Sequence, residues 1–226
     1  MRVGIITPMA EEKGTLAAAL TNSQTEKIAD IEVITGSYNE HQVFLLESGI
    51  GKVAAATATT VLIQKYQPDL VINTGSAGAL DAGLAIGDIV IGSQLAYSDV
   101  DVQVFGYDYG QLPSQPTYFE ADPRLVKIFS DLTKGSAGLI VSGDQFVQQD
   151  GKAKIREHFP QALLAEMEGA AVAQVAHRFA TPFIVLRGVS DLANGQSDQD
   201  FDDFVVEAGR VSAHLLLNFL DHNQSF

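Results

Sequence analysis

Two kinds of apolar run alternate along this chain: short runs rich in β-branched residues and longer, alanine-rich runs with helical spacing. Buried strands are predicted at 3–6, 69–75, 88–102, 137–144 and 182–191, and two strands around a polar turn at 39–41 are predicted within 31–48. Helices are predicted over 52–66, 123–134, 167–179 and 201–220. This alternation is typical of an α/β protein with a largely parallel sheet, which the hairpin makes mixed. No linker-like segment or repeat interrupts the pattern, so we expect a single domain over 1–226.

The composition supports a substantial core and narrows the choice of partners. The chain has 226 residues, 46% of them hydrophobic, and a net charge of -14. This excess of negative charge repels phosphate backbones, so no nucleic-acid partner is expected. The first apolar run is too short for a signal segment, and no uninterrupted apolar run approaches membrane-spanning length. We therefore expect a cytoplasmic protein without a membrane partner.

No metal ion or cofactor is expected from the motifs. The chain lacks cysteine, its histidines are scattered, and the acidic run at 198–204 has Asp203 where a calcium loop needs glycine. Residues 49–54, GIGKVA, match a G-x-G-x-x-A dinucleotide pattern, but they follow a hairpin arm instead of the first strand of a βαβ unit. An NAD-dependent enzyme is therefore a distant alternative.

Four predicted strands end in glycine or polar residues, within 44–52, 71–80, 139–146 and 185–193. Ligands of open α/β sheets bind beyond the carboxyl ends of the strands, so these four ends together predict a ligand site. Three carboxylates stand out by position: Glu12 follows a strand, Asp191 ends one, and Glu168 opens an apolar helix. Each has an ordinary explanation as a helix cap or dipole partner. If Glu166 and Glu168 are both helical, a turn of about 100° per residue points them to nearly opposite sides, toward different partners.

The ordered motifs resemble those of the nucleoside phosphorylase/hydrolase superfamily, and within it the branch that acts on adenine thionucleosides. The resemblance is carried by GII-x-x-M-x-EE (4–12), ESGIGKVAAA (47–56), INTGSAGAL (72–80), DVDVQVFGYDYGQLP (99–113), GLIVSGDQF (138–146), EMEGAAVAQVAH (166–177), VLRGVSD (185–191) and SDQDFDDF (197–204). It implies a three-layer α/β/α sandwich with a mixed, partly barrel-like central sheet. It also implies hydrolysis of the N-glycosidic bond of 5'-methylthioadenosine and S-adenosylhomocysteine, in methionine salvage and methyl-donor recycling.

The resemblance assigns the chemistry to two carboxylates. Asp191 is expected to protonate N7 of the purine, and Glu12 to deprotonate the attacking water. Breaking the bond forms an oxocarbenium-like ribosyl cation, so an acid at the base, a base at the water and carboxylates near the sugar suit the reaction.

The same resemblance assigns binding contacts along the substrate. Ser76, Glu166 and Arg187 support the water, whereas Glu168 and Met167 hold the sugar. Phe146, Val147 and Ala193 lie at the adenine, and the alkylthio group is lined by Ile50, Val102, Phe105 and Phe201. Further binding residues are Met9, Ala77, Gly78 and Ser190. Phe105 and Pro113 are expected to reach a neighbouring subunit, which implies a homodimer.

Three other functions are weighed against this one. A phosphorylase needs a phosphate site, usually built from arginines, and the glycine loops near Gly49 and Ser76 contain none. A futalosine hydrolase needs a more polar pocket than the apolar residues proposed for the alkylthio group. A non-catalytic nucleoside sensor has no need of all three carboxylates.

Overall fold

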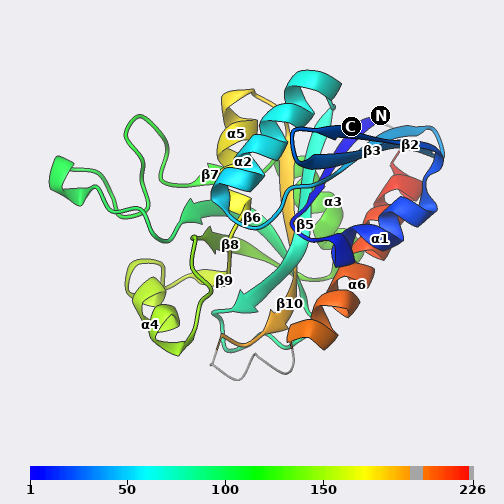
Figure 1. Ribbon diagram of the computed structural model, residues 1–226. Coiled ribbons are helices and arrows are strands. Elements are labelled where there is room, and N and C mark those ends of the chain that lie inside the picture. The colour runs from blue at the N-terminus through cyan, green and yellow to red at the C-terminus, as the bar shows by residue number, and fades with distance from the viewer. Residues whose placement is uncertain (194–200, 224–226) are drawn as a thin grey trace.

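Residues 1–193 and 201–223 are described by the computed structural model, apart from the side chains of residues 12, 201–206 and 208. Within them the chain builds a ten-stranded mixed sheet (Figure 1). The strands are β1 (Arg2–Thr7), β2 (Thr21–Ile28), β3 (Ile31–Tyr38), β4 (His41–Glu47), β5 (Leu70–Ala79), β6 (Ile89–Tyr97), β7 (Phe119–Glu120), β8 (Ser136–Ser142), β9 (Ala162–Glu166) and β10 (Phe183–Asp191). The α-helices are α1 (Ala10–Ala19), α2 (Lys52–Val61), α3 (Pro123–Thr133), α4 (Gln149–His158), α5 (Gly169–Arg178) and α6 (Phe201–His222).

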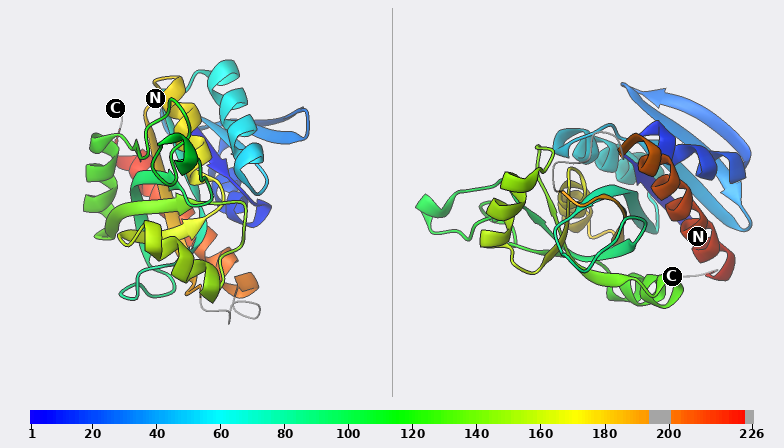
Figure 2. Two further views of the ribbon diagram at one scale, coloured as in Figure 1. Left: turned by 90° about the vertical axis from the view of Figure 1, so that its left-hand side faces the viewer. Right: turned by 90° about the horizontal axis from the view of Figure 1, so that it is seen from below.

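Strand β5 closes half of the sheet into a barrel. Its first residues pair in parallel with β1, and its last two residues pair antiparallel with β9. Along its other edge it pairs with β10, and the order β10-β6-β8-β9-β5 then returns to β10. The ring can be seen from below in Figure 2. Strands β1, β4, β3 and β2 extend from β5 as an open sheet, which brings the ends of sequence-distant strands together.

Helices cover the sheet on both sides (Figures 1 and 2). Helix α6 contacts both α1 and α3, and α2 packs against α5 on the other side. The core between these layers consists mainly of Val, Ile, Leu, Phe and Ala side chains. The predicted three-layer architecture with a mixed, partly barrel-like sheet is therefore confirmed. Among residues 1–193 and 201–223, no helix combines the length and the hydropathy that crossing a bilayer requires.

Several element boundaries differ from those expected. The hairpin within 31–48 is confirmed, but the helix expected over 52–66 is α-helical only to Val61 and then continues as a π-helical turn, Leu62–Tyr66. The strand expected at 69–75 continues to Ala79 as β5, whereas the one expected to reach 102 ends at Tyr97. Five elements lack an apolar period long enough to be recognised: α1, β2, β7, α4 and β9. The polar strand β2, for example, is exposed along almost its whole length.

Candidate active site

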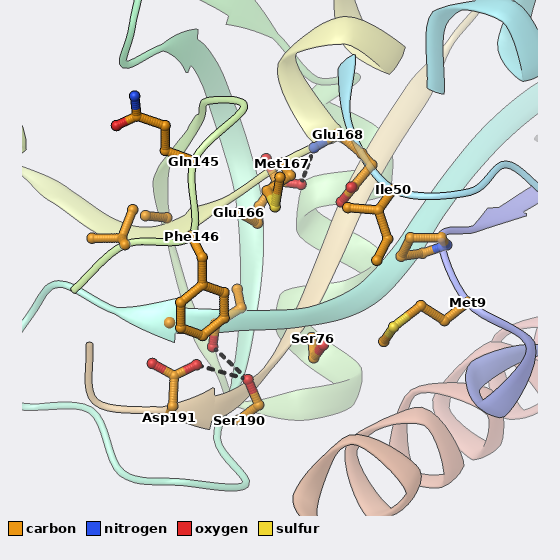
Figure 3. A pocket seen from close by; sticks show the side chains of 15 residues that line it. Met9, Ile50, Ser76, Gln145, Phe146, Glu166, Met167, Glu168, Ser190 and Asp191 are labelled. Atoms are coloured by element: carbon orange, nitrogen blue, oxygen red, sulfur yellow. Dashed lines mark hydrogen bonds between the residues drawn. The ribbon is translucent and has the colours of Figure 1, made fainter. Parts of the chain in front are cut away.

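One cavity collects residues from six separate segments (Figure 3). The residues that line it are Pro8, Met9, Ile50, Ser76, Ala77, Gly78, Gln145, Phe146, Val147, Ala165, Glu166, Met167, Glu168, Ser190 and Asp191. They follow β1 and β4, form the last part of β5, follow β8, and end or follow β9 and β10. The prediction that a ligand site lies at strand ends is therefore consistent with the cavity, although Ser76–Gly78 belong to strand β5 itself.

Asp191 is placed by a bulge in β10. The register against β5 shifts between Val189 and Asp191, which adds one residue to β10 at Ser190. Bulges of this kind redirect side chains and are common beside active sites. The Asp191 carboxyl is buried; its Oδ1 accepts a 2.8 Å hydrogen bond from the Ala193 amide, and its Oδ2 lies 3.1 Å from the Ser190 hydroxyl. A Cβ at Gly78 would lie 3.0 Å from Oδ1, so a larger residue there would require this carboxyl to shift by a few tenths of an ångström.

Glu166 is held by the protein on both carboxylate oxygens. Arg187 Nη2 donates to Oε2 at 2.5 Å, and the amides of Glu168 and Gly169 donate at 2.9 and 2.8 Å. The Ser142 hydroxyl donates to Oε1. Arg187 is fully buried and Glu166 nearly so. Glu166 therefore supports the start of α5 and the buried arginine, and it also lines the cavity. Its expected support of the attacking water stays a prediction.

Glu168 shares the arginine with Glu166. Strand β9 ends at Glu166 and helix α5 begins at Gly169, so Glu168 occupies the N-cap position and neither glutamate is inside the helix. Glu168 Oε2 lies 3.3 Å from Arg187 Nη2, and its Oε1 accepts a 2.8 Å hydrogen bond from the Gly51 amide. Opposite directions were expected only if both glutamates were helical, and this condition is not met. Both side chains contact Arg187 instead.

The apolar side chains of the cavity lie in two places. Phe146 lies near Asp191 and Ser190, whereas Ile50 lies near Glu168, with Met9 on the same side (Figure 3). Phe146 exposes 51% of its surface and Ile50 exposes 58%. Large apolar side chains left this open beside buried carboxylates are suited to contacting a flat apolar ligand.

Other predicted site residues lie outside this cavity. Val102, Phe105 and Pro113 lie in the segment 98–118 between β6 and β7, which projects from the molecule on the left of Figure 1 and leaves Phe105 75% exposed. Arg187 and Ala193 are buried behind the cavity wall and support its carboxylates. The side chains of Glu12, which belongs to α1, and of Phe201, the first residue of α6, lie outside the described part of the chain.

The structure adds residues that the sequence did not single out. Pro8, Gln145 and Ala165 line the cavity, each next to a predicted residue. Ser142 accepts a 2.7 Å hydrogen bond from the Ala170 amide while it donates to Glu166, and Asn73 accepts a 2.9 Å hydrogen bond from Arg187. Both side chains are fully buried, and both lie in motifs that carry the family resemblance, in which no role was assigned to them.

Comparisons with known proteins agree on one family. The model of the phosphorylase superfamily matches residues 2–221. The 5'-methylthioadenosine/S-adenosylhomocysteine nucleosidase of Shewanella loihica is 47% identical, over 98% of this chain and 100% of its own length. The S-adenosylhomocysteine nucleosidase of Streptococcus pyogenes, solved with 5-methylthiotubericidin, superposes with a TM-score of 0.96 at 42% identity and covers 100% of this chain and 98% of its own. The Streptococcus pneumoniae nucleosidase bound to the transition-state inhibitor MT-ImmA gives a TM-score of 0.93 at 46% identity, covering 97% and 98% of the two chains.

Proposed function

The chain belongs to the phosphorylase superfamily, and we infer that it hydrolyses the N-glycosidic bond of 5'-methylthioadenosine and S-adenosylhomocysteine. The products are adenine and the corresponding 5-thioribose. The observation that carries the residue assignment is that Asp191 and Glu168, from different segments, line one cavity together with Phe146. An acid, a sugar-binding carboxylate and an aromatic ring are the groups that this reaction requires on the purine and the ribose.

Asp191 acts as the general acid at the purine. Protonation at N7 converts adenine into a neutral leaving group, and Phe146 beside Asp191 provides a face on which the purine stacks. The Ala193 amide and the Ser190 hydroxyl hold the carboxyl in place. A positioned acid of this kind typically contributes ~10²- to 10⁴-fold to the rate.

Glu168 and Met167 bind the sugar, and Glu12 activates the water. The negative charge of Glu168 stabilises the oxocarbenium-like ribosyl cation while its oxygens accept hydrogen bonds from the ribose hydroxyls. Met167 packs against the ring from between the two glutamates. Glu12 belongs to helix α1, which begins directly after Met9 at the cavity wall, so its backbone lies within the same region.

Water is favoured over phosphate as the nucleophile. Phosphorolysis needs an arginine that can reach the phosphate. Among the described residues, the arginine beside the cavity is Arg187. Its side chain is fully buried and forms ion pairs with Glu166 and Glu168. Its charge is therefore directed to carboxylates of the protein.

The alkylthio end is completed by a second copy of the chain. Ile50 provides part of an apolar lining, whereas Val102, Phe105 and Pro113 do not line the cavity of their own chain and belong to the projecting segment 98–118. A homodimer places this segment of one protomer against the cavity of its partner. The apolar character of these residues also favours an alkylthio group over the polar extension of futalosine.

Product identification tests the proposed function. The protein is incubated with 5'-methylthioadenosine, with and without inorganic phosphate, and futalosine is offered in a parallel reaction. We expect free methylthioribose and adenine at the same rate in both buffers, with futalosine left intact. Formation of methylthioribose 1-phosphate would establish a phosphorylase, and absence of any adenine release would leave the nucleoside-sensor alternative.

A further inference from the structure

Three polar side chains outside the cavity join the loops that form its rim. Lys52 Nζ lies 2.7 Å from both carboxylate oxygens of Asp99 and 3.5 Å from Asp144 Oδ2. The Lys52 amide donates to Asp144 Oδ1 at 2.9 Å, and the Asp144 amide donates to Asp99 Oδ2 at 2.9 Å. Each of the three residues thus contacts the other two.

Each member of this network is next to a part of the proposed site. Lys52 follows the loop of Ile50, and Asp144 precedes Phe146 by two residues. Asp99 stands three residues before Val102, where the segment 98–118 leaves β6. The network therefore connects two loops of the chain's own cavity with the start of the segment proposed to reach a partner.

Packing alone holds these loops weakly. Ile50 and Phe146 each expose more than half of their surface, so burial in the core does not fix them. The Lys52 side chain is 20% exposed and packs over the Tyr97 ring, with Nζ 5.4 Å from the ring centroid. Tyr97 is itself anchored by a 2.5 Å hydrogen bond from its hydroxyl to Gln174 of α5. The network is thus attached to the rigid core of the protein.

We propose that Lys52, Asp99 and Asp144 are positioning residues that hold the Ile50 and Phe146 loops over the cavity before substrate binds. This proposal rests on the proposed function, because it takes adenine as the ligand of Phe146. Partly exposed ion pairs contribute little to global stability, so the effect of the network falls on loop geometry. A loop that is already ordered loses less entropy when it binds a ligand, which increases affinity.

The test compares K52M and D99A with K65M. Lys65 forms an ion pair with Glu26 at 2.5 Å, away from the cavity, and therefore serves as the matched control. Adenine affinity is measured by equilibrium dialysis, KM and kcat with 5'-methylthioadenosine, and folding by thermal unfolding. We expect K52M and D99A to bind adenine ~10-fold more weakly and to raise KM similarly, with kcat changed less than about 3-fold and K65M unchanged.

The double variant K52M/D99A distinguishes a network from two separate effects. If the residues act together, the double variant loses no more adenine affinity than either single variant. If K52M or D99A does not fold, D144N, whose side chain is half exposed, is measured in the same way and is expected to weaken adenine binding about 3-fold.

Two results would overturn the proposal: wild-type adenine affinity and KM in the folded variants, or losses that simply add in the double variant. Failure of the proposed function gives a different result, because the wild-type protein and K65M would then release no adenine. If the wild type cleaves the substrate normally and K52M and D99A keep wild-type adenine affinity and KM, the network is rejected while the proposed function stands.

Discussion

At the scale of single residues, two glycines leave tight space for the carboxylates that face them. A Cβ at Gly78 would lie 3.0 Å from Asp191 Oδ1, and a Cβ at Gly169 would lie 3.1 Å from Glu166 Oε1. Neither glycine has a positive φ, so the requirement is space and not backbone conformation. A small side chain beside each carboxylate allows the neighbouring strand or helix start to approach it closely.

Replacing Asp191 by asparagine tests its proposed role as the general acid. D191N removes the acidic proton but keeps an oxygen that can accept from the Ala193 amide. We expect kcat to fall by at least ~10²-fold without loss of folding, because a general acid contributes an effect of this order. Adenine release is measured together with thermal unfolding. The control is D131N, on the exposed face of α3; near-wild-type turnover by D191N would contradict the assigned role.

At the scale of elements, the groups that satisfy the first amides of a helix differ between α3 and α5. Asp122 caps α3 in the ordinary way, with its carboxylate accepting from the Arg124 amide and Pro123 at the first turn. Helix α5 has no such cap from its own N-cap residue, and the amides at its start are satisfied by Glu166 and Ser142. Helix α3, away from the cavity, uses a local cap, whereas the helix at the cavity is joined to groups of the site.

Helix α4 is attached to the cavity wall by a cation. Lys152 Nζ donates to the carbonyl of Ala79 at 2.8 Å and to that of Leu192 at 3.1 Å. Burial lowers the pKa of Lys152, the charge of Arg156 adds to this effect, and Asp191 opposes it. The Lys152 ammonium thus links helix α4 to the end of β5, at Ala79, and to Leu192, the residue that follows Asp191.

The second prediction is a pH dependence at the N-terminus of α3. The hydrogen bond with the Arg124 side chain lowers the pKa of Asp122 below its ordinary value of 3.8. A lowered pKa means that the cap stabilises the fold above pH 4 or so and that this contribution is lost as pH falls through the folded-state pKa. We expect D122A to reduce the free energy of unfolding by about 1 kcal/mol near pH 6, and by less toward pH 3.

Urea denaturation from pH 6 to pH 3 measures this difference. K127M, which removes an exposed ion pair of the same helix, serves as the control and is expected to change the free energy of unfolding by less than about 0.5 kcal/mol at pH 6. If the loss of unfolding free energy in D122A instead grew as the pH fell, the pH dependence expected for this cap would be contradicted.

At the scale of the whole molecule, the projecting segment 98–118 needs an explanation. Val104 is 86% exposed and Phe105 75% exposed, and the segment extends well away from the sheet (Figures 1 and 2). Large apolar side chains on a projection find no core within their own chain. Their exposure is typical of a surface that is covered in an assembly.

The third prediction follows from the proposed homodimer. Sedimentation is expected to give twice the mass of the chain. F105A is expected to raise KM for 5'-methylthioadenosine by ~10-fold while adenine affinity changes less than about 3-fold, because the proposed dimer places Phe105 at the alkylthio end of the partner's substrate and not at its purine. V53A replaces another exposed apolar residue and serves as the control. A fully active monomer with an unchanged KM in F105A would contradict the assembly.

The sequence predicted the chemical groups of the site better than it predicted how these groups are arranged. Asp191, Phe146 and Glu168 were named from motifs, and the structure places all three at one cavity. The partner of Glu166 was not predictable from local spacing, because the residue that holds it is Arg187, 21 positions away. The spacing argument for the two glutamates depended on both being helical, but strand β9 extends to Glu166.

By itself, the sequence determined the alternation of strands and helices, the hairpin, and the motifs that identify the family. These depend on patterns a few residues long, where periodicity and turn chemistry act directly. Only the tertiary structure decided that β5 closes a barrel, that a bulge directs Asp191 into the cavity, and that Glu166 and Glu168 share one arginine. Such contacts join residues that are distant along the chain, as for Asn73 and Arg187, 114 positions apart, so they exist only after the strands have paired.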